Sequence, residues 1–203
     1  MGDSDTKHTR ELDFLLSRAS TDHLIEPAPE KAQLAVILSA ALRAPDHGKL
    51  RPWRYVVIKG KRRQEFAELV VAAMRRTTPD VPQKKIEKRF QRFSEMPMTI
   101  VLGMHIQPDG KIPVAEQELA VGAAAMNVLN ALHAEGFGAM WVTGEYSEDP
   151  EFLAALGFAP PHRLAGFLFV GTPEKGLPHA HRPDVEDYMA IWKGEPVSFG
   201  ADK

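Results

Sequence analysis

Apolar residues follow two patterns along the chain: helical spacing among polar residues, and short continuous runs that are typical of buried strands. Helical spacing, polar faces and Pro or Gly boundaries predict helices at about Arg10–Arg18, Glu30–Leu42, Arg62–Arg76, Gln83–Glu95, Val114–Glu135 and Pro150–Leu156. Short continuous apolar runs predict strands at Trp53–Ile58, Thr99–Met104, Ala139–Thr143 and Leu164–Val170. Because strands alternate with helices, the pattern predicts a three-layer domain of the α/β or α+β class.

Small residues and helix breakers refine this outline. The longest predicted helix contains the run Gly122–Ala125, whose small side chains let backbones approach closely, so we expect it to be the central core helix. The Thr21–Pro29 segment contains Pro27 and Pro29 and is predicted to be a loop. After Gly171 the chain is rich in Pro, Gly and His and has few means of burying its own apolar residues. We therefore expect residues 172–203 to form an extended tail that covers another surface, such as a second subunit.

The amino-acid composition excludes several classes of partner and of redox centre. The chain has 203 residues, of which 44% are hydrophobic and 26% are charged, as is typical of one soluble globular domain. Its net charge of −2 gives no global basic field that would attract a nucleic acid or a membrane. The absence of cysteine excludes disulfides, thiolate nucleophiles and cysteine-ligated metal centres. Redox chemistry would therefore need a group that the chain does not itself supply.

No targeting or membrane-spanning pattern is expected. The first residues are polar and lack the apolar core of a secretory signal, and we expect residues 1–8 to be a flexible N-terminus. The most apolar long stretch, Leu119–Val142, is interrupted by Asn127, Asn130, His133 and Glu135, which does not suit a lipid-spanning helix. We expect a cytoplasmic protein.

Familiar mechanistic motifs fail at specific positions. Trp141 stands where a dinucleotide-binding motif begun by Gly136 needs its third glycine, and Arg43 stands where a phosphate-binding loop needs glycine. His179 and His181 offer two imidazoles without nearby carboxylates, so we interpret them as loop residues and expect no metal site. The segment 75–92 carries seven basic and two acidic residues. We interpret it as a solvent-exposed helix face, with a nucleic acid site as the alternative.

Three short polar segments lie where predicted helices or strands end, and the first is the Arg18-Ala19-Ser20 run. A guanidinium and a hydroxyl two residues apart in a non-helical turn can both bind one phosphate group. The alternative is an ordinary helix end, at which a basic residue complements the helix dipole.

The second segment, residues 43–53, joins a predicted helix to a buried strand and is rich in cationic and imidazole groups. It suits a polar ligand, or it is a capping loop in which Asp46 pairs with Arg43 or His47, and the sequence leaves both open. The third segment, residues 136–144, places glycines before a strand that carries Trp141, which suits a flat ligand. Its alternative is a helix end followed by a strand whose aromatic residue is in the core.

Three runs of sequence resemble a known family: RAPDHGKLRPWRYVVIKG (43–60), VAEQELAVGAAAMNVLNALHAEGFGAMW (114–141) and FLFVGTPEKG (167–176). They resemble the nitroreductase family, and most closely its small single-domain bacterial branch of NAD(P)H nitroreductases, over about residues 12–187. The resemblance implies a single FMN-binding domain over residues 1–203, of the α+β class, with three α/β/α layers and a central mixed sheet. It also implies an intimate homodimer with the flavin at the subunit interface.

The resemblance further implies which residues bind FMN. The matching positions are Arg18, Ala19, Ser20, Arg43, His47, Trp141, Val142, Thr143 and Arg182. The first three match the element that holds the phosphate and the ribityl chain, and the last matches a second contact to the phosphate. Arg43 and His47 match flavin-contacting positions, with His47 reaching the cofactor of the partner subunit. The strand segment at 141–143 matches the one that lies against the flavin.

Two of these positions depart from the family pattern. Relatives often carry arginine where this chain has Ala19, and the most similar ones carry another arginine where it has Val142. A separate segment matches one assigned to NAD(P) in relatives, and its residues are Ala131, Leu132, His133, Ala134, Glu135 and Gly136.

The implied function is hydride transfer from NAD(P)H through FMN to an oxidised small molecule, such as a nitroaromatic compound or a quinone. FMN carries this chemistry, so no residue of the chain is expected to act as an obligatory acid or base. Two other functions remain open. One is a flavin enzyme of the same fold that catalyses dehalogenation or desaturation of a ring, and the other is a non-catalytic FMN-binding module.

Overall fold

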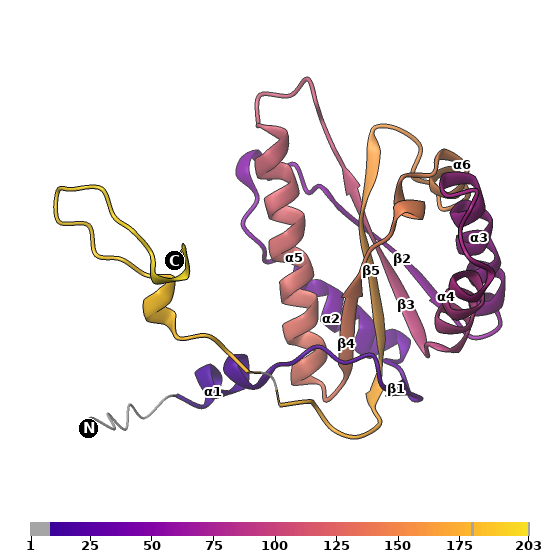
Figure 1. Ribbon diagram of the computed structural model, residues 1–203, viewed down its shortest axis with the longest axis horizontal. Coiled ribbons are helices and arrows are strands. Elements are labelled where there is room, and N and C mark those ends of the chain that lie inside the picture. The colour runs from indigo at the N-terminus through magenta and orange to yellow at the C-terminus, as the bar shows by residue number, and fades with distance from the viewer. Residues whose placement is uncertain (1–8, 180, 203) are drawn as a thin grey trace.

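A β-sheet lies between two layers of helices in the computed structural model, which describes residues 9–179 and 181–202 (Figure 1). The strands in this part of the chain are β1 (Leu24–Ile25), β2 (Trp53–Lys59), β3 (Met98–His105), β4 (Gly138–Val142) and β5 (His162–Pro173). The helices are α1 (Arg10–Ser17), α2 (Lys31–Ala41), α3 (Arg62–Thr77), α4 (Gln83–Glu95), α5 (Val114–Ala134) and α6 (Pro150–Ala155). Single turns of 3-10 helix are η1 (His47–Lys49), η2 (Glu145–Glu148), η3 (Val185–Asp187) and η4 (Gly200–Asp202). The flexible N-terminus expected at residues 1–8 lies outside the described residues.

Strand β5 organises the sheet. It pairs with β3, with β4 and with the two-residue β1, while β2 pairs with β3. All of these pairings are antiparallel, so the expectation of a mixed sheet is wrong. The reason lies in the topology. The crossover through α5 does bring β3 and β4 into the same direction, but β5 lies between them, so the two parallel strands are not neighbours.

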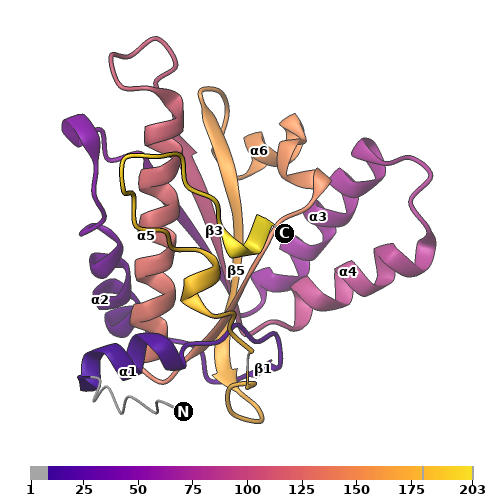
Figure 2. The same cartoon turned by 60° about the vertical axis from the view of Figure 1, so that its left-hand side comes forward.

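Helices α2 and α5 cover one face of the sheet (Figures 1 and 2). In α5, Ala124 and Ala125 are buried against the sheet and against α2, where Ile37 and Ala41 face them in the same core. Small side chains at these positions let the backbones approach closely, and the prediction of α5 as the central core helix is confirmed. Asn127 adds a polar contact, since its Nδ2 donates to the Ala40 carbonyl at 3.2 Å.

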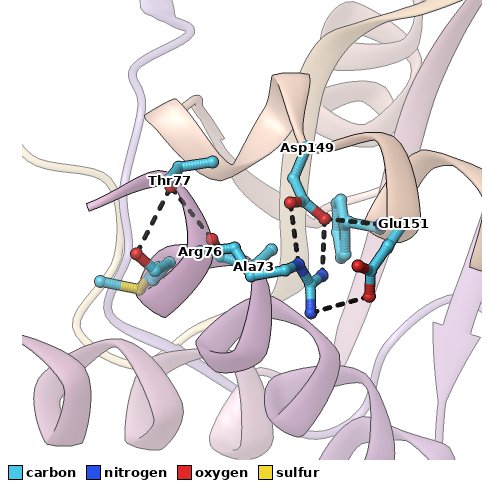
Figure 3. Close-up of polar contacts among 7 residues, drawn as sticks. Ala73, Arg76, Thr77, Asp149 and Glu151 are labelled. Atoms are coloured by element: carbon cyan, nitrogen blue, oxygen red, sulfur yellow. Dashed lines mark hydrogen bonds and ion pairs between the residues drawn. The ribbon is translucent and has the colours of Figure 1, made fainter. Parts of the chain in front are cut away.

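Helices α3, α4 and α6 cover the opposite face, over a core rich in aromatic rings. The fully or nearly fully buried rings are Phe66, Phe93, Tyr146, Phe152, Phe158, Phe167 and Phe169. The Arg76 guanidinium joins the end of α3 to Asp149, the N-cap residue of α6 (Figure 3). The structure therefore has three α/β/α layers, and the expected α+β class is confirmed.

Two segments near β5 differ from the sequence prediction. Leu24 and Ile25 form β1 by pairing with Pro173 and Thr172, inside the segment that was expected to be a loop. Two residues are too few to show an alternating pattern, so this strand depends on a partner distant in sequence. Strand β5 correspondingly runs past the predicted end at Val170, and the extended tail begins only after Pro173.

The C-terminal tail projects away from the sheet and its helices, on the same side as α1 (Figure 1). No residue of α1 is buried, and the described tail residues from 181 onward are all exposed as far as residue 201. Large apolar side chains are exposed in both segments: Leu12, Leu15, Leu16, Val185, Tyr188, Met189, Ile191, Trp192, Val197 and Phe199. An apolar surface of this extent is typical of a segment that contacts another molecule.

Candidate functional site

The end of α1 is fastened to the last turn of α5. Helix α1 starts at the Thr9 cap and ends at Ser17, and Arg18 already has extended backbone angles. The Phe14 ring stacks on His133 of α5 with the ring centroids 4.6 Å apart. Ser17 Oγ lies 2.9 Å from His133 Nε2. These two contacts fix the direction in which the chain leaves α1, and hence the place of Arg18.

Arg18 and Arg182 meet at this point although 164 residues separate them. Arg182 Nη2 donates to the Arg18 carbonyl oxygen at 2.9 Å, so the tail returns to the end of α1. The Arg18 Nε atom is buried and has no hydrogen-bond partner among the described residues. Ala19 is buried and Ser20 is exposed beside them. The Arg182 guanidinium lies at the backbone of Arg18, and Ser20 follows two residues later, so these three side chains offer charged and hydroxyl donors of the kind that suits a phosphate group.

The same segment runs beside strand β4. The Thr21 N–H donates to the Ala139 carbonyl at 3.1 Å, which places residues 18–20 next to the start of β4. Along this strand Trp141 is 37% exposed and Thr143 is exposed. The Trp141 indole Nε1 donates to the Ala165 carbonyl at 2.9 Å, so the ring is held by its polar edge and keeps an accessible surface.

Gly166 makes room for this ring. Its φ of +125° lies in the region that favours glycine, and a Cβ there would lie 2.7 Å from Trp141 Nε1 and 2.6 Å from the Val142 carbonyl oxygen. Sequence reasoning missed Gly166, although an isolated glycine inside a strand run is a signal of a close approach.

The loop after α2 forms a second candidate region. Arg43 lines a cavity of about 550 Å³ together with Leu42, Ala44, Asp46, Lys49, Arg51 and Trp53. The Asp46 carboxylate accepts the backbone N–H groups of Leu50 and Arg51 at 3.1 and 2.8 Å. Asp46 therefore folds the loop and is not paired with Arg43 or His47 as the capping-loop alternative required. Lys49 and Arg51 have φ of +54° and +50°, values that side-chain-bearing residues adopt only where the surroundings hold them.

His47 ties this loop to the first turn of α5. Its Nδ1 lies 2.6 Å from Glu116 Oε2, and both side chains are exposed. Glu116 was not singled out in the sequence, because nothing in the local pattern shows which residue of a distant helix will face the loop.

The two regions lie at opposite ends of α5. One contacts the helix through Glu116 and the other through His133, and 17 residues at a rise of about 1.5 Å each separate these positions by about 25 Å. The structure thus brings Arg18, Ala19, Ser20 and Arg182 together beside β4, and it holds His47 of the same chain at the other end of α5. Arg43 lies at the start of the loop that carries His47. A single chain holds two separate parts of the predicted site.

The segment matched to NAD(P) forms the end of α5 and the turn after it. Leu132 is buried in the core, whereas Ala134, Glu135 and Gly136 are exposed. His133 is occupied by its contacts with α1. Burial, and secondly the positive charge of Arg18, lowers the pKa of His133, so the neutral imidazole is favoured there.

The sequence model of the nitroreductase family matches residues 16–172, a range that contains both candidate regions apart from Arg182. The chain belongs to the nitroreductase family. It is similar to the Escherichia coli K12 protein named "Putative NAD(P)H nitroreductase YdjA", with 35% identity over 89% of this chain and 98% of the relative. A Haemophilus influenzae protein named "Putative NAD(P)H nitroreductase" is 31% identical over 88% of this chain and 97% of its own length.

Solved structures of this family share the fold. A nitroreductase-like family protein from Bacillus cereus superposes with a TM-score of 0.78 and 25% identity, over 93% of this chain and 99% of that one. A Desulfovibrio desulfuricans protein named "putative nitroreductase", solved in complex with FMN, superposes with a TM-score of 0.69 and 21% identity, over 95% of this chain and all of that one. Among the described residues of the present chain, no helix is long and apolar enough to cross a membrane.

Proposed function

We propose that this member of the nitroreductase family is an FMN-dependent oxidoreductase that transfers electrons from NAD(P)H to an oxidised small molecule. The observation that carries the proposal is the meeting of Arg18 and Arg182 beside β4, next to the half-exposed Trp141. A phosphate site and a flat wall on one surface suit a flavin mononucleotide. The relatives' names include NAD(P)H nitroreductase, and the Desulfovibrio protein binds FMN, which supports the same function here.

The residues present fit this cofactor. The buried and unpartnered Nε of Arg18 leaves donor capacity for a phosphate oxygen, and Ser20 and Arg182 supply further donors. The isoalloxazine ring would lie along the strand residues Trp141, Val142 and Thr143. Gly166 supports this wall, because the absence of a side chain there lets the Trp141 indole reach the Ala165 carbonyl.

The cofactor site requires a second copy of the chain. His47 contacts α5 about 25 Å along the helix from the contact made by the phosphate-binding segment, which is longer than a flavin mononucleotide. We therefore assign His47, together with Arg43 at the start of the same loop, to the cofactor held mainly by a partner. Leu119 of α5 is 73% exposed, and Met126 lies two turns further on the same face and is also exposed. We place the dimer interface on this face of α5, with α1 and the tail of one single-domain chain covering the other.

When bound, FMN accepts a hydride from NAD(P)H and delivers electrons to an acceptor such as a nitroaromatic compound or a quinone. The chain's own residues hold and orient the groups around it. Arg18, Ser20 and Arg182 bind the phosphate, and Arg43 of the partner adds positive charge, which stabilises charge that develops near it. Within the segment 131–136, the exposed residues Ala134, Glu135 and Gly136 at the end of α5 would contact the nicotinamide nucleotide. No side chain of the site needs to act as an acid or a base.

Colour and cofactor retention test the proposal directly. The purified protein should be yellow and release FMN on denaturation, and anaerobic NAD(P)H should bleach it. Arg18→Ala should weaken FMN binding at least about tenfold, since it removes a charge-assisted contact to phosphate. Arg62→Ala, which removes an exposed arginine of α3, is the matched control and should retain FMN. A colourless protein that ignores added FMN contradicts the proposal, and bound flavin that NAD(P)H does not reduce indicates a non-catalytic binding module.

Mixing variants tests the shared site. Arg18→Ala and Arg43→Ala should each be defective alone, because every site of either homodimer lacks one contact. After the two proteins are mixed and subunits exchange, about half of the dimers combine both variants and contain one intact site. Activity and FMN content should then rise toward about a quarter of wild type. No recovery in dimers shown to have exchanged would contradict the division of the site between subunits.

A further inference from the structure

One face of α4 carries a group of basic side chains outside the proposed FMN site. Lys85, Lys88, Arg89 and Arg92 follow the spacing i, i+3, i+4 and i+7, which places them on the same side of the helix. They line a cavity of about 290 Å³, which we call the basic cavity. This volume is close to the lower end of the range for small-molecule sites. Helix α4 lies on the opposite face of the sheet from α2 and α5 (Figure 2), so the basic cavity is separate from the surface assigned to the dimer.

The positive charge of this cavity is largely uncompensated. Asp22 pairs with Arg92, whose Nη2 lies 2.7 Å from Asp22 Oδ2. In the part of the chain that the structure describes, none of Lys85, Lys88 and Arg89 forms an ion pair with a carboxylate. The four lining cations and the Asp22 carboxylate that pairs with one of them sum to a charge of +3.

The glutamates of α4 do not neutralise it. Glu87 accepts a hydrogen bond from Gln83 at 3.0 Å, and Glu95 accepts one from Gln91 at 3.0 Å. Glu87 lies on the side of the helix away from the basic cavity, whereas Glu95 lies beside Lys88 and Arg92 in a neighbouring cavity. Among the described residues neither glutamate forms an ion pair with the cations of the basic cavity, and those like charges, three and four residues apart, repel each other. A bound anion would relieve that repulsion.

The two arginines of the cavity are held in place by aromatic rings. The Arg89 guanidinium lies 5.5 Å from the centroid of Tyr146, and that of Arg92 lies 5.2 Å from the centroid of Phe169. Both rings are fully buried in the aromatic core. The Arg92 Nε atom is buried and finds no acceptor among the described residues, so Asp22 satisfies only part of this guanidinium. Guanidinium groups fixed in advance lose less freedom when an anion binds.

We propose that the basic cavity binds the diphosphate group of a small anion, either inorganic pyrophosphate or the diphosphate end of a nucleotide. Four cationic side chains around one cavity suit the two phosphoryl groups of a diphosphate better than a single phosphate. The planar donor sets of Arg89 and Arg92 suit phosphoryl oxygens, and Lys85 and Lys88 supply mobile point charges at the cavity rim.

Calorimetric titration of the FMN-saturated protein with pyrophosphate at low ionic strength tests this site. We expect one pyrophosphate per chain. The double variant Lys85→Gln/Lys88→Gln should weaken binding at least about tenfold, because it removes two of the cations without disturbing a contact of the fold. The control Lys61→Gln/Lys111→Gln removes the same charge from exposed positions outside α4 and should change affinity less than about threefold. Absence of binding, or equal weakening by both double variants, would overturn the proposal.

Adenosine diphosphate distinguishes the two sources of the group. If the nucleotide binds more tightly than pyrophosphate and loses affinity in Lys85→Gln/Lys88→Gln by a similar factor, the diphosphate belongs to a nucleotide. If pyrophosphate binds more tightly, the free anion is the ligand. Nucleotide binding that this variant leaves unchanged, with no pyrophosphate binding, overturns the site. Binding of a single-stranded oligonucleotide without pyrophosphate binding overturns it in favour of a nucleic acid surface.

Discussion

Arg76 binds Asp149 through two hydrogen bonds, from Nε to Oδ2 at 2.9 Å and from Nη2 to Oδ1 at 2.6 Å (Figure 3). The same carboxylate accepts the backbone N–H of Phe152 at 2.8 Å, so it caps α6 while it holds the end of α3. The Asp149 side chain is only 5% exposed. One carboxylate thus joins two helices of the layer that covers the aromatic core.

Replacing Asp149 should separate its two roles. Asp149→Ala removes the cap and the partner of Arg76 and should lower the free energy of unfolding by about 2–3 kcal/mol. Asp149→Asn keeps a good capping side chain and loses the charge, so it should cost about 1 kcal/mol less. Urea unfolding at neutral pH measures both, and equal losses would show that the cap contributes nothing.

The loss of stability at acidic pH should also depend on the pairing of Asp149 with Arg76. Hydrogen bonding to Arg76 is the main cause that lowers the pKa of Asp149 below its ordinary value of 3.8. The folded state therefore binds the proton less readily than the unfolded state. The contribution of Asp149 to the free energy of unfolding is complete above about pH 3.8 and is lost as the pH falls below that value. Unfolding curves between pH 2 and 6 should lose part of this slope in Asp149→Asn, and an unchanged slope would contradict the assignment.

Gly166→Ala should damage the wall beside Trp141. The added Cβ would lie 2.7 Å from the indole nitrogen, in a backbone conformation with φ of +125°. We expect a loss of at least about 2 kcal/mol, together with weaker FMN retention. Gly60→Ala is the matched control, because Gly60 also has positive φ, +61°, but nothing lies within 4 Å of its Cβ position. A similar effect of both variants would mean that backbone strain alone is responsible.

His133 should make stability depend on pH. Burial lowers the pKa of His133 in the folded state below its ordinary value of 6.5. The contribution of this residue to the free energy of unfolding is therefore complete above about pH 6.5 and is lost as the pH falls below that value. His133→Phe keeps an aromatic ring against Phe14 but cannot titrate. The stability difference between pH 7.5 and 5.5, measured by urea unfolding, should be smaller in this variant. It should not vanish, because burial also lowers the pKa of His105.

The exposed tail should control the oligomeric state. Ile191 is 74% exposed in one chain, and Ile191→Asp places a charge in the proposed interface. Sedimentation velocity should show dissociation at protein concentrations at which the wild type is dimeric. Leu69→Asp makes a comparable change on α3, on the other face of the sheet, and should leave the dimer intact. An unchanged dimer in Ile191→Asp would remove the tail from the interface.

Local patterns predicted most elements because each of them carries its own signals. The boundaries of α4 agree with the prediction at both ends, and those of α3 differ by one residue at its end, Thr77. Asp149 and Pro150 open α6 as expected, since the cap and the first helical residue are adjacent in sequence. Strand β1 and the antiparallel neighbours of β5 were not predictable in this way, because pairing depends on residues far away in the chain.

In the candidate site, too, the sequence predicts local features but not the contacts between distant residues. Arg18 and His47 lie close to predicted helix ends, which the sequence shows, but their distance from each other follows from the length and position of α5. The resemblance to nitroreductases supplied the expectation of two subunits. Glu116 and Gly166 were not predicted from the sequence, because their roles depend on contacts with His47 and Trp141, which are distant along the chain.

Helix α5 has a consequence for how the protein behaves on dilution. A continuous helix with a buried face cannot fold back on itself, so no movement within one chain closes the distance between its two ends. Specific activity should then fall as the protein is diluted toward the dissociation constant of its dimer. Excess FMN would not restore it, whereas added chain, even chain defective in one of the two regions, would.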